Sequence, residues 1–141
     1  MIILYIEDSD EVREAKTEGL RSYGFDVIEA SGPSDALHQI EQHHAKIDVI
    51  LLDIMMPHED IVERERVKNG LMTGYILLEK LNSKAGRIIP VIVFTAYSNR
   101  DDLKLIEANP QIKGVMERGS DGFEKLIKKL GELDKLKMTK S

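Results

Sequence analysis

Residues 47–53 read IDVILLD, an apolar run that ends on a carboxylate. Ile, Val and Leu follow one another here without the alternation that marks a half-exposed strand. Such continuous apolarity is typical of a strand covered on both faces by helices, as in parallel sheets. The stretch therefore predicts a central strand over residues 47–52, with Asp53 at its carboxyl end.

Similar runs lie on both sides of this stretch, at residues 2–6, 88–94 and, more weakly, 112–116, and a shorter mixed run at 25–29 suits an outer strand. Helical stripes lie between them; the first consists of Val12, Ala15, Gly19 and Leu20, and the last begins near Asp121. Strand and helix alternate five times. The pattern predicts an α/β fold in which a five-stranded, parallel, doubly wound sheet lies between two helical layers.

The 141 residues suit one domain, which we expect at 1–134, followed by a short, polar, frayed tail at 135–141. One segment departs from the regular alternation. Residues 57–71 read PHEDIVERERVKNGL and stand between the third strand and its helix, where two to six residues are usual. We interpret about 58–71 as a charged insertion, either a solvated helical excursion or a lid or docking element for a partner.

The composition excludes several kinds of site. The chain has no cysteine, so it has no disulfide, thiolate metal site or thiol nucleophile. Its net charge of −5 disfavours nucleic acid as a partner. No apolar run approaches the length of a membrane span or a signal peptide, so we expect a cytoplasmic protein. The four histidines form no metal-binding pattern; His43 and His44, for example, are adjacent and cannot share a helix face.

Three carboxylates follow two of the predicted strands. Glu7 and Asp8 come after the first strand, and Asp53 closes the third. If these strands are neighbours, the acids converge, and their repulsion calls for a hard divalent cation, with Mg²⁺ (or Mn²⁺) as the best candidate. Thr95 ends the fourth strand. Its hydroxyl could donate to a phosphoryl oxygen or simply to a neighbouring strand end.

Three segments of the sequence resemble those of a known family. ILYIEDSDEVR at 3–13, VILLDIMMP at 49–57 and PVIVFTA at 90–96 look like the three signature segments of response regulator receiver domains. The resemblance covers nearly the whole chain apart from the insertion and the tail. It implies a flavodoxin-like fold of strand order 2-1-3-4-5 and a single-domain response regulator of two-component signalling.

The resemblance also implies a role for each residue of the site. Asp53 would accept a phosphoryl group from a histidine kinase or a histidine phosphotransfer protein. Mg²⁺ would be bound by Asp8, Asp53 and the backbone carbonyl of Met55, with Glu7 reaching it through water. Thr95 and Ala96 would contact the phosphoryl group. The protein would catalyse only its own phosphorylation and dephosphorylation, and would signal to an unknown target through protein contacts as a monomer or weak homodimer.

Two departures from the family pattern stand out near the fifth strand. Arg118-Gly119 replaces the expected lysine and proline, and Val115 takes the place of an aromatic switch residue. Lys113 is an alternative cation, although it falls too early in the strand. Arg118 keeps the positive charge that a phosphoryl oxygen attracts, so it is also a candidate phosphate-binding residue. Because its guanidinium is wider than an ammonium group, we expect it either to reach past the phosphoryl group or to pair with an acid such as Asp53 before phosphorylation.

Met55 and Tyr97 occupy places that flank the path of an attacking water in receivers. Both side chains are bulky, and neither is an acid or amide that could orient water. The sequence therefore predicts slow loss of phosphate from Asp53.

Two rival functions stay open. A receiver-like scaffold that never carries phosphate is favoured by Arg118 and the missing aromatic residue, and opposed by the intact acid trio. A small phosphatase with Asp53 as nucleophile would need a general acid nearby, and the residues that follow Asp53, Ile-Met-Met-Pro, offer none.

Overall fold

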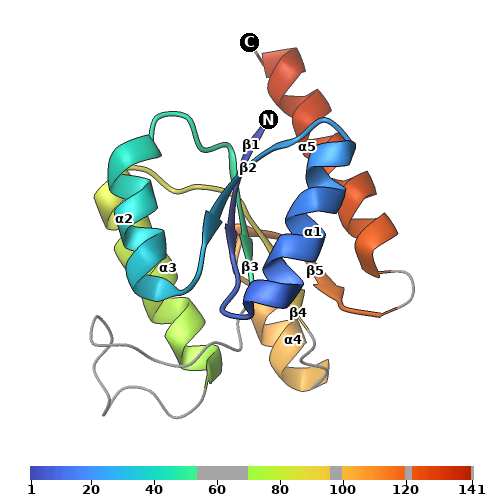
Figure 1. Cartoon of the computed structure of the whole chain (residues 1–141). Coiled ribbons are helices and arrows are strands. Elements are labelled where there is room, and N and C mark those ends of the chain that lie inside the picture. The colour runs from blue at the N-terminus through green and yellow to red at the C-terminus, as the bar shows by residue number, and fades with distance from the viewer. Residues whose placement is uncertain (54–69, 96–99, 120–121, 141) are drawn as a thin grey trace.

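The structure, a computed structural model, describes residues 1–53, 70–95, 100–119 and 122–140, and for 70–75, 100, 102 and 137–140 it describes the backbone alone (Figure 1). Strands and helices alternate along the chain. Their order is β1 (Ile2–Ile6), α1 (Asp10–Ser22), β2 (Asp26–Ala30), α2 (Pro33–His43), β3 (Val49–Leu52), α3 (Gly70–Ala85), β4 (Val91–Thr95), α4 (Arg100–Glu107), β5 (Ile112–Glu117) and α5 (Gly122–Lys140).

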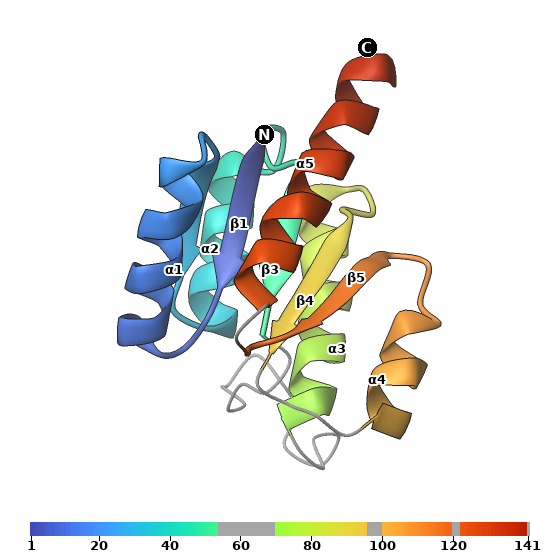
Figure 2. The ribbon, with the colours of Figure 1, turned by 90° about the vertical axis from the view of Figure 1, so that its right-hand side faces the viewer.

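The five strands form one sheet in which every pair is parallel and the order is β2-β1-β3-β4-β5. Helices α1 and α5 cover one face, and α2, α3 and α4 cover the other (Figure 2). The predicted fold class, strand order and three-layer arrangement are confirmed. None of the helices within the described ranges is both long and apolar enough to cross a membrane.

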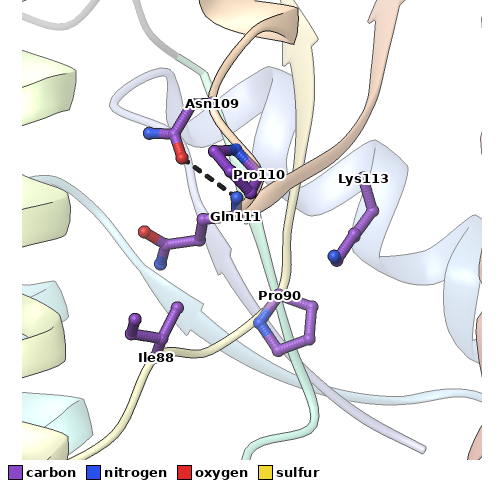
Figure 3. A pocket seen from close by; sticks show the side chains of 6 residues that line it. All are labelled: Ile88, Pro90, Asn109, Pro110, Gln111 and Lys113. Carbon is purple, nitrogen blue, oxygen red and sulfur yellow. Dashed lines mark hydrogen bonds between the residues drawn. The ribbon is translucent and has the colours of Figure 1, made fainter.

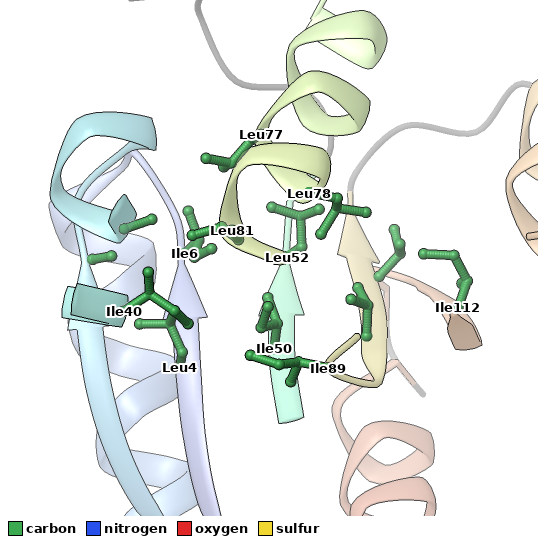
Figure 4. Close-up of a cluster of buried hydrophobic side chains, with 14 of the residues drawn as sticks. Leu4, Ile6, Ile40, Ile50, Leu52, Leu77, Leu78, Leu81, Ile89 and Ile112 are labelled. Carbon is green, nitrogen blue, oxygen red and sulfur yellow. The ribbon is translucent and has the colours of Figure 1, made fainter. Parts of the chain in front are cut away.

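Successive residues of a strand point to opposite faces, so each inner strand supplies two cores. Leu4 and Ile6 of β1 pack under α2 and α3, whereas Ile3 and Tyr5 pack under α1 and α5 (Figure 4 shows the first of these cores). All four side chains are fully buried. This double burial, worth about 1.5–3 kcal/mol for a large apolar side chain, is the reason for the unbroken apolar runs in the sequence.

Two glycines allow the helices on the α5 side to pack closely. A Cβ on Gly19 of α1 would lie 2.8 Å from the ring of Phe123 in α5. At Gly122, a Cβ would overlap the carbonyl oxygen of Glu117 more closely than van der Waals radii permit. Only glycine therefore lets the first turn of α5 sit against the end of β5, beside Arg118.

The structure corrects several predicted boundaries. The third strand begins at Val49 rather than residue 47, because the Asp48 side chain accepts a hydrogen bond from the backbone N–H of Ile2. The fourth begins at Val91, since Ile88 is 71% exposed and Pro90 has no N–H to donate to a neighbouring strand. Residues 135–140, predicted as a frayed tail, continue α5 to Lys140. The insertion predicted at 58–71 lies outside the described residues, except that Gly70 and Leu71 form the start of α3.

Candidate functional site

The acid cluster forms where β1 and β3 end side by side. Ile6 and Leu52 are register partners, so Glu7 and Asp53 leave neighbouring strands at the same level, and the N–H of Asp53 donates to the carbonyl of Ile6 at 3.2 Å. One carboxylate oxygen from each of Glu7, Asp8 and Asp53 lies within 4.8 Å of the others. Glu7 and Asp53 are buried, at 1% and 5% exposure, whereas Asp8 is exposed. The predicted convergence is confirmed.

Both oxygens of the Asp53 carboxylate accept a hydrogen bond. Thr95, fully buried at the end of β4, donates its hydroxyl to Oδ1 at 2.9 Å. Arg118, just beyond β5, donates from Nη2 to Oδ2 at 3.1 Å. The same nitrogen also donates to Oε2 of Glu7, which makes an ion pair. Arg118 thus joins two acids from different strands, and of the two arrangements expected for it the pairing with an acid is the one observed.

Arg118 is held in place by its surroundings. Its backbone N–H donates to the carbonyl of Thr95 at 2.8 Å, and its guanidinium carbon lies 5.7 Å from the centre of the Phe94 ring. Its side chain is 20% exposed, but the Nε atom is buried without a hydrogen-bond partner. A cation in this position offsets much of the repulsion between Glu7 and Asp53.

Burial is the main electrostatic influence on Glu7. Loss of solvent raises the pKa of Glu7 from 4.5 to about 7, and the neighbouring Asp53 adds to the rise. The N–H of Ser9, which donates to Oε1 at 3.1 Å, and the charge of Arg118 oppose it. A cation that enters the cluster would favour the charged form of Glu7 and so release the Glu7 proton.

The donor set suits a hard divalent cation. Three carboxylate oxygens converge at the end of the sheet, one of them exposed to solvent, and oxygen ligands with open positions for water are what Mg²⁺ prefers. The fit is therefore good for Mg²⁺. Met55, Ala96 and Tyr97, which the sequence placed around the metal and phosphoryl group, lie outside the described residues.

The remaining two positions predicted for the site differ in their surroundings. Val115, the predicted switch position, is half-buried in β5, pairs in register with Val93, and packs against the core under α4. Lys113, the alternative cation, lies at the opposite end of β5 from Arg118. Figure 3 shows it beside a hollow of about 330 Å³ that no carboxylate lines, formed by Ile88, Pro90, Asn109, Pro110, Gln111 and Lys113. The cation of the acid cluster is therefore Arg118.

Sequence reasoning missed one residue of this region, Arg13 of α1. Its Nη1 donates to the backbone carbonyl of Glu7 at 2.8 Å, and its side chain is only 11% exposed. The predicted stripe on α1 placed Ala15 on the inner face, yet Ala15 is exposed, and Thr17 and Leu20 are the residues that α1 buries. No apolar pattern could have revealed an inward arginine whose partners lie on other segments.

Comparison with known proteins agrees with this geometry. The family model of the response regulator receiver domain matches residues 3–110. A cyclic di-GMP phosphodiesterase of Thermotoga maritima is 33% identical over 139 residues, which are 99% of this chain and 30% of that protein. The transcriptional regulatory protein PdtaR of Mycobacterium tuberculosis is 28% identical over 99 residues, 70% of this chain and 40% of that protein. The chain thus spans less than half the length of either relative.

Solved structures share the fold. The N-terminal domain of an uncharacterized protein from Wolinella succinogenes superposes with a TM-score of 0.73 at 22% identity, covering 100% of this chain and 99% of that one. The response regulator TrrA from Thermotoga maritima, crystallised in complex with Mg(2+)-BeF, gives a TM-score of 0.68 at 23% identity, covering 94% and 97%. With its family match, strand order and acid cluster, this chain belongs to the response regulator receiver domains of two-component signalling, a family in which phosphorylation and Mg²⁺ binding at an acidic pocket are typical.

Proposed function

We propose that Asp53 accepts a phosphoryl group, in a Mg²⁺-dependent reaction, from the histidine of a kinase or phosphotransfer protein. One observation carries the proposal. Asp53 is a buried carboxylate with a hydroxyl donor on one oxygen and a guanidinium on the other, beside two further acids. A buried acid with this many polar neighbours at the carboxyl ends of parallel strands is the expected place for chemistry in an open α/β sheet.

In the reaction, a carboxylate oxygen of Asp53 forms a bond to phosphorus while the bond from phosphorus to the donor's histidine nitrogen breaks. Mg²⁺, when bound, neutralises charge on the phosphoryl oxygens and on the acids. Glu7, Asp8 and Asp53 would hold the metal, and the carbonyl of Met55 is a further proposed ligand. Mn²⁺ has the same preference for oxygen ligands and could replace it.

Thr95 and Arg118 are the chain's own donors to the transferred group. Both already donate to Asp53, at 2.9 Å and 3.1 Å, so they stand within a short movement of any group attached to its oxygens. The unpaired Nε–H of Arg118 is a further donor next to the one that binds Asp53. We propose that both residues shift from the carboxylate to phosphoryl oxygens, with Ala96 assisting, and that this movement, transmitted near Val115, changes the surface read by a target protein.

This function requires no turnover of an external substrate. The likeness to the phosphodiesterase covers 30% of that protein and brings no such activity to this chain. We propose that the chain catalyses only the gain and loss of its own phosphoryl group. It would act as a monomer or weak homodimer, which sedimentation with and without a phosphodonor would test.

The direct test is to incubate the protein with Mg²⁺ and acetyl phosphate and to measure its intact mass. The wild type should gain one phosphoryl group, and Asp53→Asn should gain none while it stays folded, because the amide is nearly isosteric with the acid. Asp26→Asn, at an exposed aspartate that begins β2, is the matched control and should label normally. Stoichiometric labelling of Asp53→Asn, or a wild type that never labels, would refute the proposal and favour a scaffold without phosphate.

A further inference from the structure

Arg13 joins three segments around the start of α1. Its Nη1 donates to the carbonyl of Glu7 at 2.8 Å, and its Nη2 donates to Oδ1 of Asp10 at 2.6 Å. Its Nε lies 3.3 Å from Oε1 of Glu29 in the adjacent strand β2, an ion pair without a hydrogen bond. The side chain is 11% exposed, whereas those of Asp10 and Glu29 are 76% and 33% exposed. A guanidinium with planar, fixed donors is suited to such multiple contacts.

The contact with Arg13 gives the backbone of Glu7 a second hydrogen bond. The N–H of Glu7 donates to the carbonyl of Ala30 at 3.1 Å, and its carbonyl accepts from Arg13. The turn that follows is short, because Ser9 already caps α1 by accepting from the N–H of Val12. Asp8 lies inside this turn, so the directions of two acids of the cluster depend on the backbone that Arg13 holds.

Among the described residues, the side chains that Arg13 pairs with are Asp10 and Glu29, not Asp8 or Asp53. Arg13 therefore reaches the acid cluster through the backbone. Its positive charge has the opposite effect, because a cation near the cluster repels an entering metal ion. If Arg13 positions the backbone, its loss should weaken metal binding. If it acts only through its charge, its loss should strengthen metal binding. The sign of the change in affinity therefore distinguishes the two roles.

We propose that Arg13 is a positioning residue of the metal site, which fixes the turn from β1 to α1 so that Glu7 and Asp8 present their carboxylates to one cation. Glu29 is its anchor on β2. The inference rests on the proposed function, since it assumes that the acid cluster binds Mg²⁺. Residues that orient metal ligands from outside the ligand set typically contribute 10–100-fold to metal affinity.

The test compares Arg13→Met with Arg13→Lys by calorimetric titration of the purified protein with Mg²⁺. Methionine keeps most of the aliphatic stem and removes both the donors and the charge. We expect about tenfold weaker binding of Mg²⁺, the lower end of the range for such residues, although the lost charge by itself would strengthen it. Lysine keeps the charge, but a single ammonium cannot span the three partners, so it should also bind Mg²⁺ more weakly.

Arg21→Met is the matched control on the same helix. Arg21 also donates from Nη2 to a backbone carbonyl of the sheet, that of Val27 at 3.0 Å, but at the other end of α1. Its replacement removes the same charge and the same kind of hydrogen bond far from the cluster, and should leave Mg²⁺ affinity unchanged. Glu29→Gln, which leaves Arg13 in place, serves if the Arg13 variants fail to fold, and should weaken binding by a smaller factor.

Hydrogen exchange without metal supplies the second readout. The amide of Ser9, which donates to the Glu7 side chain, should exchange faster in Arg13→Met than in the wild type and in Arg21→Met. Unchanged or tighter Mg²⁺ binding by Arg13→Met would overturn the positioning role while leaving the proposed function intact. A wild type that binds no Mg²⁺ would overturn the metal part of the proposed function and this inference together.

Discussion

Replacing Arg118 by methionine should destabilise the protein in a way that depends on metal. The substitution removes the guanidinium that joins Glu7 to Asp53 and lies near the ring of Phe94, and it keeps most of the aliphatic stem. Two buried carboxylates then face each other without their cation. We expect the wild-type protein to be more stable than Arg118→Met in the absence of Mg²⁺, and the difference to narrow when Mg²⁺ is present.

The size of the effect follows from the geometry. Carboxylate oxygens of the cluster lie within 4.8 Å of one another. Two unit charges at that separation repel by about 3.5 kcal/mol at an effective dielectric constant of about 20, which is an upper limit because Glu7, whose pKa is raised to about 7, can take up a proton when the guanidinium is lost. Breaking a buried ion pair costs about 3–5 kcal/mol, and the 20% exposure of the Arg118 side chain favours the lower end. A loss of about 3 kcal/mol would lower the melting temperature by roughly 10 °C in a domain of this size.

The assay is thermal and urea unfolding at pH 7.5, with a chelator in one series and saturating Mg²⁺ in the other. Mg²⁺ should restore most of the loss, because it binds the same acids and no longer competes with the guanidinium. Arg118→Lys keeps the charge and should lose much less stability without metal. An equal loss for Arg118→Met in both series, or an equal loss for methionine and lysine, would show that Arg118 contributes only by packing and would refute the reasoning.

Four further outcomes concern the surroundings of Asp53. The free energy of unfolding of the wild type should rise by about 2.7 kcal/mol when Mg²⁺ is present at 100 times its dissociation constant, and Asp8→Asn should lose most of this rise. Melting temperatures that do not change with millimolar Mg²⁺ would exclude a metal site. Without metal, stability should fall as pH rises from 4.5 to about 7, because in this range the folded state keeps the Glu7 proton that the unfolded chain has released. In urea unfolding, the free energy of unfolding of Glu7→Gln should decline less steeply with pH than that of the wild type. Equal slopes for the two proteins would show that the Glu7 proton is not the cause. Thr95→Val should cost about 1–3 kcal/mol in the same assay, since the hydrogen bond from the Thr95 hydroxyl to Oδ1 of Asp53 is lost, and no loss would show that this hydrogen bond is unimportant. Phosphate loss, followed by intact mass, should be slow and should speed up when Met55 and Tyr97 are cut to alanine; fast loss that the substitutions leave unchanged would show that they do not shield the bond.

Much of the fold could be predicted because a strand that is buried on both faces requires apolar residues at successive positions, and such runs are visible in the sequence. The first strand was predicted at its observed bounds, Ile2–Ile6, since every residue in it is apolar and the acids begin immediately after. The boundaries that failed are those set by single contacts. Asp48 delays the start of the third strand through its side-chain bond to the Ile2 backbone, and no periodicity encodes that partner.

The candidate site likewise has one part that the sequence predicts and another that it does not. The meeting of Glu7, Asp8 and Asp53 follows from strand order alone, because neighbouring parallel strands end at one edge. The hydrogen bond from Arg118 to Glu7 does not follow, because it depends on how far a long side chain reaches across β3 and β4. Arg13 escaped notice for a similar reason, since its role lies in a backbone carbonyl rather than in a matching side chain.

The contacts around Asp53 also bear on how the chain assembles. They join residues 42, 65 and 111 positions apart, from Thr95 to Asp53, from Arg118 to Asp53 and from Arg118 to Glu7. Contacts this distant along the chain form slowly, because long loops must close first. A folding intermediate in which β5 has not yet docked would hold the acids without their cation, a state in which they repel. Such an intermediate should therefore be less stable without Mg²⁺ than one in which β5 has docked, and Mg²⁺, which neutralises the same acids, should favour the assembly of this end of the sheet before the last strand arrives.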